Sequence, residues 1–122
     1  MITKNKIKMK YTINIGLRDN NYSKAVELIN NARQGGYFED YHIRELNGVY
    51  NGIPEPTIVL TFETKADITS MVPLIENWCT QMNQICIAMQ LKDNDNNTFG
   101  ALIYEPNFKG EQQSFNINYF LK

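Results

Sequence analysis

The order of strand-like and helix-like hydrophobic patterns is the feature that most limits how this chain can fold. Residues 11–17 alternate apolar and polar side chains, which is the period of a half-buried strand. Residues 22–32 repeat apolar side chains at three- and four-residue steps, which indicates one face of a helix that ends at Gly35-Gly36. The alternation returns over residues 41–46, and the β-branched run at 57–62 predicts a central strand.

The second half of the chain repeats this order. Residues 68–82 carry a second helical face, interrupted by Pro73, which must kink the helix or mark its restart. The preceding residues 64–67 resemble a capping box that begins at Thr64. Residues 84–91 and 98–104 read as a hairpin around the polar turn 93–97, and 114–121 as a further strand. This order predicts an α+β, ferredoxin-like β-α-β-β-α-β antiparallel sheet with two helices on one face, plus an extra hairpin strand and a C-terminal strand. We expect residues 1–122 to form one domain, with 1–10 as a flexible N-terminal extension.

The segment 47–57 carries the first candidate site residues. It contains two glycines and two prolines, which predict an irregular connector, because glycine admits positive φ and proline fixes φ and removes a donor. Tyr50 lies in this segment, and Glu55 stands between Pro54 and Pro56, just before the apolar run 58–62. Because Pro56 disfavours the α region for Glu55, the carboxylate is expected on stiff, extended backbone. The alternative is a solvated turn glutamate.

Composition excludes several classes of partner. The formal net charge of −1 gives no long-range field that favours nucleic acid or an anionic membrane surface. No window approaches the roughly 20 apolar residues that span a bilayer, and the N-terminus lacks the apolar stretch of a signal peptide. We therefore expect a cytoplasmic protein that binds neither nucleic acid nor membrane.

The cysteines and the histidine give no metal or nucleophile signature. Cys79 and Cys86 lack the CxxC spacing, and the single histidine, His42, is far from both in sequence, so no zinc set can be assembled. The apolar surroundings of both thiols should raise their pKa values, which disfavours a Cys/His nucleophilic pair. We expect no metal and no cofactor.

Five short motifs, in order, resemble the phage-encoded S-adenosylmethionine (SAM) lyases, formerly called SAM hydrolases. The resemblance spans about Tyr11 to Tyr104 and is carried by residues 48–50, 55–58, 78, 84–87 and 100–104. It implies a homotrimer of ferredoxin-like subunits that binds its ligand at a subunit boundary and cleaves the sulfonium into methylthioadenosine and homoserine lactone. A related branch, associated with type III CRISPR antiviral signalling, acts on the conjugate of SAM with AMP (SAM-AMP).

By this resemblance, Glu55 and Tyr50 are catalytic residues, and Gln84 binds substrate together with Tyr50. Tyr104 and Asn14 are second-rank binding candidates. Two departures stand out: the segment between Tyr50 and Glu55 is shorter here, and the residue after the glutamine, often acidic in the family, is Ile85. Loss of an acidic group beside the ligand suits a more anionic substrate, which favours SAM-AMP over free SAM. Ile85 facing the core is the alternative.

The scarcity of ionisable groups agrees with this chemistry. The methionine carboxylate of SAM is itself a nucleophile and the thioether a neutral leaving group, so ring closure needs orientation and no protein nucleophile. Four alternatives remain. The chain is a lyase that acts on SAM-AMP, or a phage anti-restriction lyase that acts on free SAM. Otherwise it is a non-catalytic nucleotide-binding trimer, or a phage protein that inhibits a host enzyme through an exposed sheet face.

Overall fold

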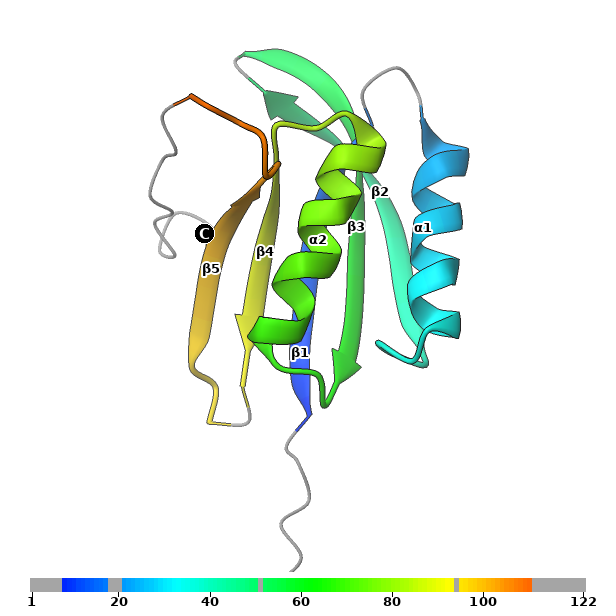
Figure 1. Ribbon diagram of the computed structural model, residues 1–122, viewed down its shortest axis with the longest axis vertical. Helices are drawn as coiled ribbons and strands as arrows, with labels where there is room; N and C mark the ends of the chain where they lie inside the picture. The colour runs from blue at the N-terminus through cyan, green and yellow to red at the C-terminus, as the bar shows by residue number, and fades with distance from the viewer. Residues whose placement is uncertain (1–7, 18–20, 51, 94, 111–122) are drawn as a thin grey trace, which may run out of the picture.

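The computed structural model describes residues 8–17, 21–50, 52–93 and 95–110. Figure 1 shows the helices in front of the sheet. In chain order, the described elements are β1 (Met9–Gly16), α1 (Tyr22–Gln34), β2 (Tyr41–Tyr50), β3 (Ile53–Thr64), α2 (Ile68–Met82), β4 (Cys86–Lys92) and β5 (Thr98–Tyr104).

The strands form an antiparallel sheet in the order β2-β3-β1-β4-β5, with both helices on one face (Figure 1). The predicted α+β, ferredoxin-like fold is therefore confirmed, including the extra hairpin strand β5. The predicted strand 114–121 and residues 1–7 lie outside the described residues. Met9 and Lys10, expected in the extension, belong to β1, because β3 is long enough to pair them with Thr64 and Glu63.

One layer of core fills the space between the sheet and the helices. Alternate residues of β1 point into this layer, namely Tyr11, Ile13 and Ile15, and their neighbours on β3 and β4 do the same. The helices contribute their apolar faces, with Trp78 of α2 and Ile29 of α1 completely buried. The predicted strand and helix periodicities thus converge on one core.

The prediction of an irregular connector at 47–57 is wrong. Most of that segment continues the β2–β3 hairpin, where Gly48 pairs with Glu55 and Asn47 with Pro56. A strand residue directs its N–H and C=O to the same side, and the Pro56 carbonyl accepts a 2.8 Å hydrogen bond from the N–H of Leu17. Pro54 and Pro56 therefore turn their nitrogens away from β2, so their missing donors remove no bond from the β2–β3 ladder.

Helix α2 runs through Pro73 without a restart. Pro73 leaves the carbonyl of Thr69 without its helical donor, and both residues are exposed, so water can reach that carbonyl. The helix begins at an N-cap formed by Asp67, whose Oδ1 accepts a 3.1 Å hydrogen bond from the N–H of Ser70. Thr64, the expected first residue of a capping box, instead donates its hydroxyl to the Tyr37 carbonyl.

Tyr11 fastens the central strand to the start of α2. Its ring is fully buried and stacks on Phe62, and its hydroxyl donates a 2.8 Å hydrogen bond to the carbonyl of Ala66. Burial, and secondarily the negative charge of Asp67, raises the pKa of the Tyr11 phenol to about 12. The phenol therefore stays neutral and keeps donating at physiological pH.

We predict that Tyr11→Phe lowers the free energy of unfolding by about 1–2 kcal/mol at pH 7, because the Ala66 carbonyl loses its partner. Tyr22→Phe, at an exposed position of α1, is the matched control and should change little. The folded-state pKa of Tyr11 is raised above its unfolded value, so its contribution is complete below pH 10 and is lost as pH rises through about 12. Urea titrations should show the gap between wild type and Tyr11→Phe closing over that range; a gap independent of pH would contradict the assignment.

Candidate functional site

The candidate site lies where the central strand ends. Gly16 is the last residue of β1 and pairs with Thr57 of β3. The β2–β3 hairpin extends beyond this point on one side, and on the other the chain leaves α2 and enters β4 (Figure 1). Three segments far apart in sequence therefore meet at one end of the sheet.

Glu55 reaches this point from β3. Alternation along β3 places Glu55 on the same face as Thr57 and Val59, which is the face opposite the helices. The Thr57 hydroxyl donates a 3.1 Å hydrogen bond to the Glu55 carbonyl, which holds the backbone locally. With a proline on each side, the carboxylate stands on extended and stiff backbone, as the sequence predicts.

Gln84 reaches the same point from the connection between α2 and β4. Helix α2 ends at Met82, and Asn83 adopts the left-handed conformation at its C-cap. The backbone N–H of Gln84 donates a 2.9 Å hydrogen bond to the Cys79 carbonyl, so the helix end fixes this residue. The side chain is only 9% exposed. Gln84 was expected within a strand, but β4 begins two residues later, at Cys86.

The side chains of Glu55 and Gln84 converge over the Cα of Gly16. A Cβ placed on Gly16 would overlap Glu55 Oε1 and would lie 3.1 Å from both Glu55 Cδ and Gln84 Oε1. The structure therefore brings together the predicted catalytic carboxylate and the predicted substrate-binding amide, although they are far apart in sequence.

This pair carries buried polar atoms without partners. Among the described residues, Glu55 Oε1 and Gln84 Nε2 are the buried side-chain nitrogen or oxygen atoms that make no hydrogen bond. Buried polar groups in folded proteins are almost always paired, so each exception calls for an explanation. Rotating the Gln84 amide by 180° exchanges its oxygen and nitrogen, so this side chain can present either an acceptor or a donor. The pair is thus equipped to hold a ligand that carries hydrogen-bond donors, above all a cationic one.

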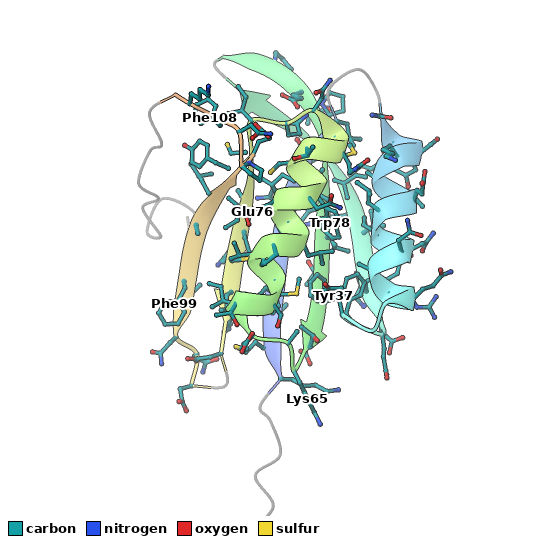
Figure 2. All side chains as sticks on the ribbon, in the orientation of Figure 1. Tyr37, Lys65, Glu76, Trp78, Phe99 and Phe108 are labelled. Atoms are coloured by element: carbon teal, nitrogen blue, oxygen red, sulfur yellow. The ribbon has the colours of Figure 1, made fainter. Side chains whose placement is uncertain are left out.

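Two cavities lie near this end of the sheet. One, of about 430 Å³, is lined by Leu17, Pro56 and Thr57 among others, the chain neighbours of Gly16 and Glu55. The other, of about 310 Å³, includes Gln84 and Phe108 in its wall. A cavity of about 710 Å³ lies at the opposite end of the sheet, and Figure 2 shows that Lys65 in its wall is far from Phe108. We place the site at the cavity of about 310 Å³, because Gln84 lies in its wall, whereas the walls of the other two contain no predicted site residue and no buried unpaired atom among the described residues.

The other predicted site residues lie at varying distances from this pair. Asn14 is on β1, two residues before Gly16 and on the same face. Tyr104 ends β5, two strands and about 10 Å from β1, and its ring stacks on Phe108 with centroids 5.2 Å apart. The backbone of Tyr50 pairs with Ile53 at the tip of the hairpin, but its side chain is outside the described part of the structure.

Gly16 is the residue that sequence reasoning missed. Its signal was available: it takes an outward-facing position in the alternating segment 11–17, and a glycine within a strand pattern often marks a close approach of another group.

The described residues contain no metal-binding cluster, and burial limits the reactivity of both thiols. No group of three His, Cys, Asp or Glu side chains there is placed to hold a metal ion. Burial, followed by the nearby Cys86, Glu105 and Glu76, raises the pKa of the Cys79 thiol to about 12, and its Sγ donates a 3.2 Å hydrogen bond to the Ile103 carbonyl. Burial also raises the pKa of Cys86.

None of the described helices is long and apolar enough to cross a membrane.

Comparison with known proteins identifies two solved structures of phage SAM lyase that share this fold. The apo structure superimposes with a TM-score of 0.58 at 11% sequence identity, covering 84% of this chain and 94% of its own. The complex with S-methyl-5'-thioadenosine gives a TM-score of 0.50 at 10% identity, covering 84% and 95%. No protein-family model and no curated protein sequence matches the chain. At these identities the likeness establishes a common fold.

The environment of the two cysteines predicts their reactivity. In the folded protein at pH 8, iodoacetamide should alkylate Cys86 slowly and Cys79 hardly at all, because the raised pKa values leave little thiolate and Cys79 is fully buried. Both should react rapidly in urea. Intact-mass spectrometry over a time course measures each step, and rapid alkylation of Cys79 in the native protein would show that the thiol is available as a nucleophile.

Proposed function

We propose that this protein is a carbon–sulfur lyase that cleaves the sulfonium of a SAM-type nucleoside by intramolecular lactonisation. One observation carries the proposal: the side chains of Glu55 and Gln84 converge over Gly16, and each carries a buried polar atom without a hydrogen-bond partner. They do so in a fold shared with phage SAM lyase. The sequence motifs that resemble this family include both residues.

The proposed reaction needs no cofactor and no protein nucleophile. A carboxylate oxygen of the substrate attacks its own Cγ, the Cγ–S bond breaks, and the bonding electron pair passes to sulfur, which becomes a neutral thioether. No proton is transferred. Catalysis then consists of holding the substrate bent for in-line attack, which is an effect of orientation, and of excluding water while opposite charges cancel.

Each residue of the pair has a role in this scheme. Glu55 binds the α-ammonium or the sulfonium of the substrate through charge, since the attacking carboxylate is already deprotonated and needs no base. Gln84 holds the amino-acid portion through its amide. Tyr50 packs against or hydrogen-bonds the ligand, a role that rests on the family resemblance, and Asn14 and Tyr104 are further binding candidates.

We further propose SAM-AMP as the preferred substrate, which makes the protein a cytoplasmic enzyme that degrades a second messenger of type III CRISPR signalling to methylthioadenosine-AMP and homoserine lactone. The support is Ile85, which lines the cavity of about 310 Å³ beside Gln84 where the family often has an acidic residue. An apolar side chain there removes one repulsion toward a phosphodiester. Glu105 remains in the same wall, but its Oε1 accepts a 2.9 Å hydrogen bond from the N–H of Asn107.

The test is a product analysis with each substrate separately. Incubation with SAM-AMP in ¹⁸O-labelled water should give methylthioadenosine-AMP and unlabelled homoserine lactone at early times, because the ring oxygen comes from the substrate. Mass spectrometry identifies the products. Turnover of free SAM but not of SAM-AMP would overturn the preferred substrate, labelled homoserine would show hydrolysis, and unchanged ligand that binds tightly would favour the non-catalytic nucleotide-binding trimer.

Replacing the carboxylate tests its role directly. Glu55→Gln should lower kcat/KM on the order of 10- to 100-fold, the value of one hydrogen bond to a charged group. The melting temperature should not fall, since a buried oxygen without a partner is desolvated without compensation. Glu63→Gln makes the same change at an exposed position of β3 and should leave both quantities unchanged. Full activity of Glu55→Gln would remove this residue from the mechanism.

We also propose a homotrimer with sites between subunits. Among the described residues, no helix packs on the opposite face of the sheet, and Leu46 of β2, 45% exposed, lies on that face. Light scattering should give three times the mass of the chain. Leu46→Glu should dissociate the assembly and lower activity, while Phe99→Glu, at an exposed position of the edge strand β5 on the other face, should not. A fully active monomer would contradict shared sites.

A further inference from the structure

We propose that Gly16 is a positioning residue: the absence of its side chain creates the space in which the carboxylate of Glu55 and the amide of Gln84 converge. The three atoms closest to the position of a Gly16 Cβ all belong to these two side chains. The space is therefore occupied by the groups that would bind the ligand. This inference deepens the proposed function and, as to catalysis, rests on it.

Backbone conformation does not account for the glycine. Gly36 and Gly52 adopt positive φ, whereas Gly16 has no such conformation and pairs as an ordinary strand residue with Thr57. An alanine is therefore compatible with the backbone at this position. Glycine differs from alanine at this position because it leaves free the space above its Cα, which the Glu55 carboxylate occupies.

The contact with Gly16 positions the Glu55 carboxylate without using its hydrogen-bond acceptor. Glu55 Oε1 rests over the Gly16 Cα and accepts no hydrogen bond within the described structure. A carboxylate held by a hydrogen-bond donor would already have used the acceptor that a cationic ligand requires. Steric support from Gly16, with stiff backbone on both sides of Glu55, orients the group and leaves its charge available.

A methyl group at this position should displace the Glu55 carboxylate, which it overlaps, whereas the Gln84 amide needs to give way by only a few tenths of an ångström. Relief of the overlap requires the Glu55 carboxylate to move about 1 Å or more, until ordinary contact of roughly 3.5 Å is restored. The atoms in the way are the ends of flexible side chains, so Gly16→Ala should fold. Unlike Glu55→Gln, this variant keeps the carboxylate and changes only where it lies.

The first experiment compares crystal structures of the wild type, Gly16→Ala and Gly35→Ala. Gly35, at the C-cap of α1, has φ −77°, which alanine also adopts, and lies far from the pair along the chain, so it is the matched control. The Glu55 carboxylate should move in Gly16→Ala and stay in place in Gly35→Ala. An unmoved carboxylate in Gly16→Ala would overturn the inference, and this comparison needs no substrate.

The second experiment measures kcat/KM for the sulfonium substrate in a double-mutant cycle. Gly16→Ala should cost on the order of 10- to 100-fold, up to the loss expected for Glu55→Gln, because a displacement of about 1 Å can have this effect on positioned groups, and Gly35→Ala should cost nothing. In a Glu55→Ala background, where the carboxylate is absent, Gly16→Ala should cost less than about twofold. A merely structural role of Gly16 would give the same loss in both backgrounds and would overturn the inference.

The two possible failures are distinguishable. A wild-type protein that neither binds nor cleaves SAM or SAM-AMP would overturn the proposed function, and the crystal comparison would still decide whether Gly16 positions the pair. An active wild type with an equally active Gly16→Ala would overturn the positioning role and leave the proposed lyase activity intact.

Discussion

The central strand β1 is the constraint on which the rest of the structure depends. It pairs with β3 from Met9 to Gly16 and with β4 from Lys10 to Asn14, so most of its backbone donors and acceptors are used within the sheet. One set of its side chains enters the core beneath both helices, and the other set faces the open side of the sheet. Its last residue, Gly16, lies beneath the candidate site. Any change in β1 register would therefore shift the core and the site together.

The buried unpaired atoms of Glu55 and Gln84 are most informative because their surroundings are so well satisfied. Tyr11, Thr64 and Cys79, each buried, direct their side-chain donors to backbone carbonyls. Against this background, an unpaired atom on each of two side chains that converge over Gly16 is expected to reduce stability. A cost of this kind is expected where a binding site is held ready for a ligand. A ligand that carries a charged donor for Glu55 Oε1 and an acceptor for Gln84 Nε2 would satisfy both atoms.

Sequence periodicity was enough to predict the helices, the hairpin β4–β5 and the ferredoxin-like order, because each element buries one regular face. It failed at 47–57, where composition predicted an irregular connector and Pro54 and Pro56 instead lie in β3. The side to which a proline nitrogen points depends on which strand lies there, and a linear pattern does not contain this information. The approach of Glu55 to Gln84 across Gly16 depends on the order of β3, β1 and β4, which is likewise a property of the assembled sheet.

At Glu55, a stiff backbone is combined with a carboxylate oxygen that makes no hydrogen bond, and this combination suits a reaction that depends on the orientation of the substrate. The prolines restrict its backbone, the β2–β3 ladder holds its strand, and Gly16 supports its carboxylate from below. None of these constraints uses the acceptor Oε1. A reaction in which the substrate supplies both nucleophile and leaving group gains from fixed placement more than from proton transfer. For such a reaction, a carboxylate that is held by steric contact and keeps a free hydrogen-bond acceptor binds a cationic substrate better than a carboxylate already hydrogen-bonded to the protein.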